Sequence, residues 1–353
     1  WTSGSVVAGA EGIVHVAAYG TSRANIQSAI DATPTGGLVQ LDCITYTLDG
    51  TPISISKILT FKGCGPKGTT LTGGAATMIA GTAGSIVIRD MSLVIAAGQT
   101  GISMDFAGAL TRGMTAHNLE VYNGATGINI VKNLYKNIVT DSFFQNQTVY
   151  SIRLQNTANP DAGNNIVVNN AFEAIQNNVI SVAQHAGGLQ FANNTLLAGS
   201  GNTGTIAIDV SIPASSSQLA MIGNAIDQYD YAARVNQTTP GVLFGDAVIS
   251  GNILGARVTN IALVGNAADS FSSISRVVIT GNNFKSELST TFKGVSMANV
   301  EQITVTGNGF NGGGGTQQFL TSSGAQAVNY VGNNHINVTL GAPYLGTGYK
   351  LVD

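Results

Sequence analysis

The stretch Val277-Val278-Ile279-Thr280-Gly281-Asn282-Asn283-Phe284 decides the fold, because the chain repeats its pattern several times. An alternating apolar run leads into Gly-Asn, and one large apolar residue follows two positions later. The same pattern returns at residues 219–226, 247–254 and 303–310. A pattern that recurs at a nearly fixed interval is typical of a repeat architecture, in which each unit buries its apolar side against the next unit.

Asparagines mark one corner of each expected repeat. The steps between them are 24 to 30 residues long, and a second series of short apolar strands lies between them. Two or more strands per turn with a polar corner residue fit a parallel β-helix, whose turns stack about 4.8 Å apart. Stacked asparagine side chains would hydrogen-bond along the axis. The expected ladder positions are Asn118, Ser142, Asn170, Asn194, Asn224, Asn252, Asn282, Asn308 and Asn333.

The composition supports this fold class. Charged residues make up only 9% of the 353 residues, and 45 are glycines, so strand and turn formers outnumber good formers of exposed helices. We predict an all-β solenoid of about 10–12 turns. Residues 21–341 form the solenoid, 1–20 an opening segment and 342–353 a C-terminal tail. A leucine-rich solenoid has shorter repeats, and a propeller has longer ones. Inside, we expect an apolar column that includes Phe172, Phe284 and Phe310.

A short helix is expected at residues 22–33, just before the first strands. Ile26, Ala29 and Ile30 fall on one helical face, and Thr21 or Ser22 can cap the first turn. A helix at this place is suited to cover the open end of a strand stack.

The two cysteines, Cys43 and Cys64, lie 21 residues apart, or about one turn, which is within disulfide reach. Two buried free thiols are the favoured interpretation.

Charge and hydropathy exclude several function classes. The net charge of −3 gives no basic surface, so we expect no nucleic-acid partner. No apolar run approaches the roughly 20 residues of a membrane span, so membrane insertion is not expected. No set of acids at adjacent corners predicts a metal site, and no cofactor is expected.

Several segments resemble the start of pectate-lyase-like proteins. The helix segment Ile26-Gln27-Ser28-Ala29-Ile30-Asp31, the Gly36-Gly37 strand start, Tyr46 and the segment 59–65 match that pattern, although the usual acidic beginning is reduced to Ala18–Ser22. The resemblance implies a right-handed parallel β-helix. It is closest to bacteriophage tailspikes and to capsule or O-antigen depolymerases. This kinship implies a homotrimer on the virion tail that binds and cleaves bacterial surface polysaccharide outside the host cell.

Three carboxylates stand out in a chain with so few charges. Glu173 follows ladder residue Asn170 by three positions, and Asp227 follows Asn224 by three, so both are expected in one surface column, two turns apart. That separation, roughly 9–10 Å between backbones, suits the carboxyl pair of an inverting glycosidase. Some tailspike hydrolases likewise combine a Glu with an Asp-x-x-Asp pair, which Glu173 and Asp227-x-x-Asp230 resemble. We predict Glu173 as general acid and Asp227 with Asp230 as general base, or the reverse.

Aromatic and charged residues nearby are predicted to bind the sugar, since aromatic faces and planar donors suit pyranose rings. The predicted substrate-binding residues are Arg153, Asp209, Tyr229, Tyr231 and Arg234. Glu173, Asp227 and Asp230 can also be solvated corner residues or structural partners of Arg153 and Arg234.

Two other functions remain open. A polysaccharide lyase needs a base and a group that neutralises a uronate; the available residues are His117, Tyr122, Tyr150, His185, Arg112 and Arg153. A receptor-binding spike that adheres without cleavage is the alternative that is not an enzyme.

Overall fold

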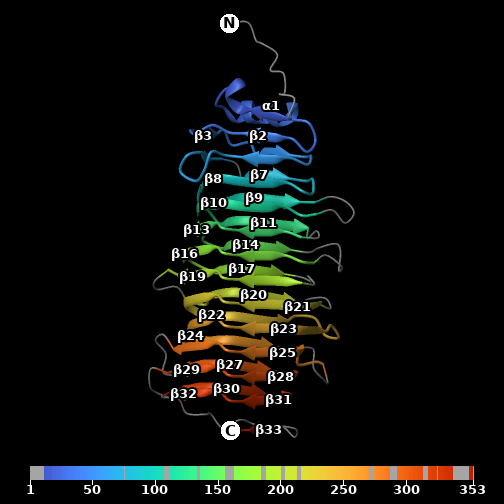
Figure 1. The fold of residues 1–353 in the computed structure, drawn as a ribbon, viewed down its shortest axis with the longest axis vertical. Coiled ribbons are helices and arrows are strands. Elements are labelled where there is room, and N and C mark those ends of the chain that lie inside the picture. Colours follow the sequence, from blue (N-terminus) through green and yellow to red (C-terminus); the bar gives the residue numbers. More distant parts are fainter. Residues whose placement is uncertain are drawn as a thin grey trace.

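The computed structural model describes residues 12–74, 76–106, 112–132, 136–155, 163–183, 188–199, 203–212, 216–269, 274–286, 292–312, 317–323, 325–336 and 350–352. In these ranges the chain is a long solenoid of β-strands with one α-helix at its N-terminal end (Figure 1). Each turn contributes strands to three faces, which we call face 1, face 2 and face 3 in chain order.

The strands sort into the three faces by their pairing. Face 1 contains β1 (Ile13–His15), β2 (Leu38–Gln40), β5 (Thr60–Lys62), the first parts of β8 (Val87–Ile95) and β10 (Thr115–Asn123), β12 (Ile138–Thr140), β15 (Ile166–Val168), β18 (Leu189–Ala192), β21 (Ser216–Ile222), β23 (Phe244–Ser250), β25 (Ile274–Thr280), β28 (Val300–Thr306), β31 (Gln326–Val331) and β33 (Lys350–Val352). Face 2 contains β3 (Thr45–Leu48), β6 (Thr70–Gly73), the second parts of β8 and β10, β13 (Phe143–Gln145), β16 (Ala171–Ile175), β19 (Thr195–Ala198), the first parts of β22 (Ala225–Gln237) and β24 (Ile253–Val264), β26 (Asn283–Ser286), β29 (Gly309–Asn311) and β32 (Asn334–Ile336). Face 3 contains β4 (Ile53–Ile55), β7 (Thr77–Gly81), β9 (Thr100–Asp105), β11 (Thr126–Lys132), β14 (Tyr150–Gln155), β17 (Asn178–Ala183), β20 (Ile206–Ile212), the second parts of β22 and β24, β27 (Lys293–Ala298) and β30 (Gln318–Ser323).

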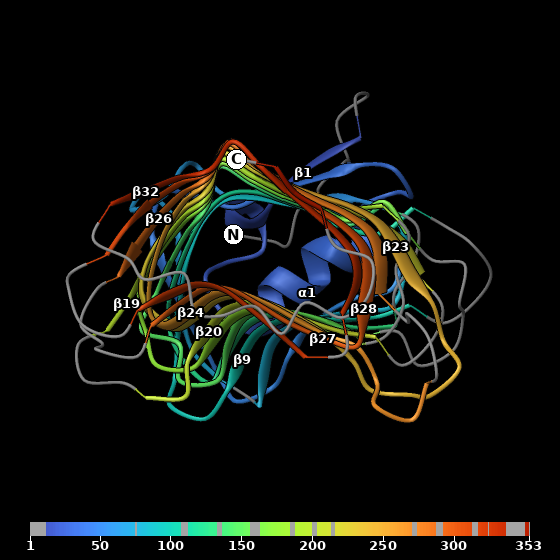
Figure 2. The same ribbon diagram turned by 90° about the horizontal axis from the view of Figure 1, so that it is seen from below.

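Each strand pairs in parallel with its counterparts in the turns before and after it, so equivalent residues of successive turns form columns. Figure 2, a view along the axis, shows the three faces enclosing one interior. The predicted parallel β-helix is therefore confirmed. Both ends of the chain add to face 1, because β1 pairs with β2, and β33, from the expected tail, pairs with β31.

Apolar side chains that point inward fill the solenoid. The expected phenylalanine column exists behind face 2, with aliphatic residues between its two aromatic ends. Phe144 and Phe172 are stacked with ring centroids 4.9 Å apart, and Phe284 lies 6.4 Å from Phe310. The strand register gives the column as Phe144, Phe172, Leu196, Ile226, Leu254, Phe284 and Phe310.

The helix α1 (Arg23–Ala32) closes the N-terminal end, as predicted. The Ser22 hydroxyl accepts a hydrogen bond from the Asn25 amide at 3.2 Å, and Ile26, Ala29 and Ile30 are buried. A short 3₁₀ helix, η1 (Val16–Ala18), precedes it. Figure 2 shows α1 lying across the interior of the solenoid. No helix in the described part of the chain is long and apolar enough to cross a membrane.

A buried ladder of amide side chains runs along the corner between faces 1 and 2. The Oδ1 of each asparagine accepts two hydrogen bonds from the asparagine one turn earlier, one from its backbone N–H and one from its side-chain Nδ2. From Asn194 N and Nδ2 to Asn224 Oδ1 both distances are 3.0 Å. The same contacts continue from Asn170 to Asn333, and Ser142 begins the series by accepting from the Leu119 amide at 3.1 Å. The predicted ladder is thus confirmed, except at Asn118.

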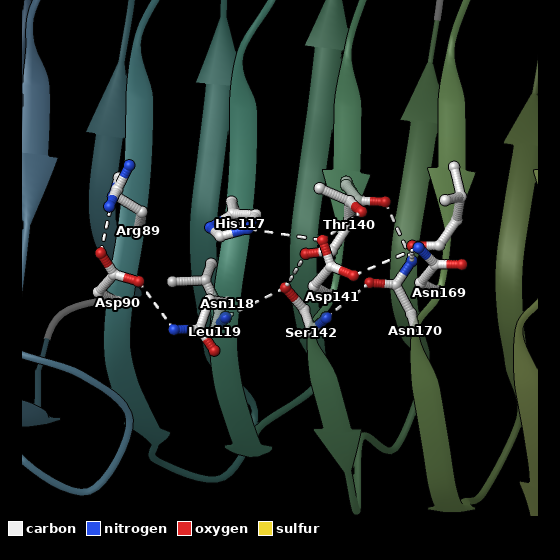
Figure 3. Close-up of polar contacts among 12 residues, drawn as sticks. Arg89, Asp90, His117, Asn118, Leu119, Thr140, Asp141, Ser142, Asn169 and Asn170 are labelled. Carbon is white, nitrogen blue, oxygen red and sulfur yellow. Dashed lines mark hydrogen bonds and ion pairs between the residues drawn. The ribbon is translucent and has the colours of Figure 1, made fainter.

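Asn118 lies one position earlier, in an outer row at the same corner. Its Nδ2 donates to Asp90 at 2.7 Å, and Leu119 takes the inner position (Figure 3). Every residue of the outer row has a positive φ, from 52° at Asn118 to 67° at Gly223. Asp, Asn and Gly are the residues that adopt this left-handed conformation most readily, which explains the row's composition. The outer row is Asp90, Asn118, Asp141, Asn169, Asn193, Gly223, Gly251, Gly281, Gly307 and Gly332.

Cys43 and Cys64 form a disulfide, with their Cα atoms 5.4 Å apart. The expectation of two buried free thiols is therefore wrong. Both cysteines are exposed, because they lie in corners on successive turns rather than on strands that face the core.

Candidate functional site

Glu173 and Asp227 lie in one column of face 2. Glu173 pairs with Leu197 of the next turn, and Leu197 pairs with Asp227 of the turn after that. The register places the two carboxylates two turns apart, as the spacing of the asparagines predicts. Their backbones are therefore separated by roughly 9–10 Å, with the side chain of Leu197 between them.

The two carboxylates differ in their surroundings. Glu173 is exposed, and its Oε2 accepts a weak hydrogen bond from Gln145 at 3.4 Å. Asp227 is half-buried, and its Oδ1 is buried without a hydrogen-bond partner among the residues that the structure describes. A buried carboxylate oxygen without a donor costs free energy, so this side of the Asp227 carboxylate is not stabilised by the surrounding described residues.

Tyr122, a lyase candidate, and Gln145, which sequence reasoning missed, extend this column toward the N-terminus. Tyr122 pairs with Gln145, and Gln145 pairs with Glu173. The Tyr122 hydroxyl donates to Glu120 at 2.9 Å, and the Ser92 hydroxyl donates to the same oxygen at 3.2 Å. Burial, then the hydrogen bond and charge of Glu120, raise the pKa of Tyr122 to about 12. The ladder register could have placed Glu120 and Gln145 here.

Asp230 does not join the carboxyl pair. It is buried at the bend between faces 2 and 3, where its Oδ1 lies 3.0 Å from Arg257 Nε. The Gly204 amide also donates to its carboxylate, and its own amide donates to Thr205 Oγ1 at 3.2 Å. Because these groups occupy the carboxylate, Asp230 is better described as holding the bend than as a base for water.

Tyr229 is fully buried and cannot contact a ligand, which corrects the expectation that it binds substrate. The register of β22 against β24 shifts on both sides of Tyr229, and this irregularity turns the ring into the core. Its hydroxyl has no hydrogen-bond partner among the described residues, and burial raises its pKa far above the ordinary range. Tyr231 is half-buried at the start of the face 3 part of β22.

The other predicted substrate-binding residues share one column on face 3. Arg153, Ser181, Asp209 and Arg234 follow each other in four successive turns. Arg234 forms a bidentate ion pair with Asp209, with both N–O distances 2.9 Å, and Asn178 donates to Asp209 at 3.4 Å. The paired Asp209 is buried, so this pair joins two turns. The Arg153 guanidinium lies over the Tyr150 ring, 4.9 Å from its centroid.

The structure separates most of the residues proposed for a lyase. His117 lies on face 1, where its Nε2 is 3.5 Å from Asp141 of the outer row (Figure 3). Tyr122 lies on face 2, and Arg112 is exposed just before β10. His185 is outside the described residues. Tyr150 and Arg153 alone are in contact among the described candidates.

The outer row carries polar contacts but no open site. Arg89 Nε lies 2.7 Å from Asp90, and Asn169 donates to Asp141 at 3.3 Å. Burial works against ionisation of Asp90, but hydrogen bonds from Asn118 and Arg89 and nearby positive charge outweigh it and lower its pKa. Within the described ranges no group of three or more His, Cys, Asp or Glu residues could hold a metal ion.

A separate cavity of about 310 Å³ lies on face 1. Ile166, Ala220 and Val248 are among its lining residues, and Asp246 is the one carboxylate among them. Arg276 holds Asp246 through two hydrogen bonds of 2.7 and 3.0 Å. This cavity therefore lacks a second acid that could work with Asp246, and face 2 offers the better pair.

Solved structures with similar folds include an epimerase module, a phage tailspike and a surface adhesin. The A-module of the mannuronan C-5 epimerase AlgE4 from Azotobacter vinelandii is 15% identical and has a TM-score of 0.66, with 95% of this chain and 100% of that chain covered. The tailspike of the E. coli bacteriophage HK620, solved with a pentasaccharide, is 14% identical with a TM-score of 0.56, covering 93% and 60%. The surface adhesin PfbA of Streptococcus pneumoniae is 14% identical with a TM-score of 0.55, covering 94% and 93%.

At these identities the likeness establishes the fold. The resemblance to pectate-lyase-like β-helices, phage tailspikes among them, is confirmed at that level. No described protein family matches the sequence, and no curated protein matches it.

Proposed function

We propose that this chain binds a bacterial surface polysaccharide along face 2 and hydrolyses it with inversion. The observation that carries the proposal is the alignment of Glu173 and Asp227 in one column, two turns apart. Inverting glycosidases hold their carboxyl groups about 6.5–9.5 Å apart, which leaves room for water between the base and the sugar. Side chains that lean toward each other from backbones roughly 9–10 Å apart reach this range.

We propose the roles predicted from the sequence. Glu173, exposed at the surface, donates its proton to the glycosidic oxygen while the bond from that oxygen to the anomeric carbon breaks. Asp227 accepts a proton from the water that attacks the anomeric carbon from the opposite side.

The tailspike likeness extends the proposal to location and assembly. A phage tail protein that meets its polysaccharide at the host surface fits the fold of the HK620 tailspike, which was solved with a pentasaccharide. We propose the same setting here, with a homotrimer as the assembled form. Sedimentation of the purified chain tests the assembly, since a mass of one chain in solution would contradict it.

The proposed hydrolysis is tested by incubating the chain with host polysaccharide and measuring new reducing ends. Glu173→Gln and Asp227→Asn should each lower the rate by at least about 100-fold, because each removes one proton-transfer group. Glu301→Gln, a carboxylate on face 1, serves as the matched control and should retain full activity. Full cleavage by both site variants would refute the assignment.

A lyase at Tyr150 and Arg153 is the second candidate, because these two side chains are in contact. In β-elimination the tyrosine would take the proton next to the uronate carboxyl, and the arginine would neutralise that carboxylate. The glycosidic C–O bond at the next carbon would break, and its oxygen would leave with a proton from water. The product then carries a double bond that absorbs in the ultraviolet. Absorbance that disappears in Tyr150→Phe would favour this reaction. Binding without reducing ends or absorbance would favour an adhesin.

A further inference from the structure

Face 2 carries negative charge without nearby positive charge on its strands. From the second part of β10 to residue 255 of β24, its strands contain Glu120, Glu173 and Asp227 but neither lysine nor arginine. The first cation along this face is Lys285 on β26, two turns beyond Asp227. Arg257, at the bend, lies against Asp230 instead.

Aliphatic side chains are exposed beside these carboxylates. Leu197, between Glu173 and Asp227, is 37% exposed, and Ile253 is 48% exposed. Ile253 pairs with Ala225 in the neighbouring column of the same face, one turn beyond Asp227. Phe143 is half-exposed in that neighbouring column, three turns before Ala225. The carboxylates are thus set among apolar groups that a ligand can cover.

The carboxylates and the exposed aliphatic side chains of face 2 together determine which class of ligand can bind there. Ionised carboxylates, such as the proposed base Asp227, only accept hydrogen bonds, so they suit hydroxyl and amide N–H donors and repel another carboxylate or a phosphate. Apolar side chains at the same place gain free energy when they cover methyl groups.

Resting on the proposed function, we infer that face 2 takes a neutral glycan whose units carry methyl groups. Sugars of this class are 6-deoxyhexoses and N-acetylhexosamines. The same reasoning excludes a polyuronate from face 2, although a fold neighbour is a mannuronan epimerase.

The test measures binding of the full chain to an array of bacterial polysaccharides, both neutral and anionic. Neutral polymers that contain 6-deoxyhexose or N-acetylhexosamine should bind at least about tenfold more tightly than polymers that contain uronate or phosphate. Raising the salt concentration should strengthen any residual binding of the anionic polymers, because it screens the repulsion.

Leu197→Lys identifies the face that is responsible. It places a cation between the carboxylates and removes the apolar contact, so affinity for neutral polymers should fall by about tenfold while binding of anionic polymers rises. Ile58→Lys is the matched control, because Ile58 is also an exposed aliphatic residue, with 45% of its surface accessible, and lies outside face 2. It should change neither the affinity for neutral polymers nor that for anionic ones.

The outcomes separate this inference from the proposed function. Preferred binding of anionic polymers that depends on Leu197 would overturn the inference and leave hydrolysis at Glu173 and Asp227 standing. Preferred binding of neutral polymers that Leu197→Lys does not alter would also overturn the inference, because another face would then be the binding site. Binding of no polymer would overturn both.

Discussion

The asparagine ladder offers the sharpest test of what holds the turns together. Asn224 Oδ1 accepts the backbone N–H of Asn194 at 3.0 Å, and its Nδ2 donates to the Phe191 carbonyl at 2.9 Å. Asn224→Ala therefore takes these hydrogen-bond partners away from two buried groups, the Asn194 N–H and the Phe191 carbonyl. The Asn194 Nδ2 keeps a second partner, the Val167 carbonyl at 2.8 Å, so it is not orphaned.

The expected loss of stability follows from those two groups. A buried polar group that loses its partner costs about 1–3 kcal/mol, so Asn224→Ala should lower the free energy of unfolding by about 4 kcal/mol. Asn193→Gly is the matched control, because Asn193 is exposed and has a φ of 54°, which glycine adopts without strain. Its effect should stay below about 1 kcal/mol.

Urea unfolding followed by circular dichroism measures both variants, and the shift in midpoint multiplied by the slope gives the difference in free energy. If Asn224→Ala and Asn193→Gly unfold at the same urea concentration, the ladder does not stabilise the stack and the reasoning fails. A solenoid also unfolds turn by turn when neighbours couple weakly, so limited proteolysis near residue 224 should accelerate in the first variant.

Two further predictions concern the N-terminal turns. Reduction of Cys43–Cys64, or Cys43→Ser, should lower the free energy of unfolding by about 3 kcal/mol, since the bond closes a loop of 21 residues; an unchanged melting temperature with dithiothreitol would contradict this. Burial chiefly raises the pKa of Tyr46 to about 12, so the folded state favours the neutral phenol. Its contribution is complete below pH 10.0 and is lost as pH rises through about 12. Thermal melts at pH 9 to 12 should therefore show a smaller alkaline loss in Tyr46→Phe than in the wild type.

The β-helix could be predicted from the sequence because each repeat marks the same position in the turn. Once Gly281-Asn282 and its copies fix one corner, strand alternation fixes which residues share a column, and Glu173 and Asp227 follow. The error at Asn118 arose where the corner lacks its glycine. In the later turns Gly marks the outer row and Asn the inner one, but in the early turns both rows carry polar residues, as at Asn169 and Asn170.

The details around the site depend on departures from the repeat. The shifted register beside Tyr229 reverses the side that alternation predicts. The pairing of Asp230 with Arg257 joins two turns across a bend whose path no local pattern encodes. We predicted that Asp209 and Arg234 bind sugar because both lie at outward-facing positions. They also lie in adjacent turns of one column, so their opposite charges pair with each other.

The position of the disulfide indicates whether the chain folds before or after Cys43 and Cys64 are oxidised. Cys43 and Cys64 are both exposed, and β2, β5 and α1 hold their turns together through contacts that need no sulfur chemistry. Solenoid assembly and bond formation are therefore separable steps. We expect the chain to fold with both thiols free under reducing conditions and to form the disulfide afterwards, when an oxidant reaches the folded surface. Thiol labelling before and after cell lysis would detect disulfide formation that follows folding. A Cys43–Cys64 bond already complete inside the cell would show that oxidation comes first.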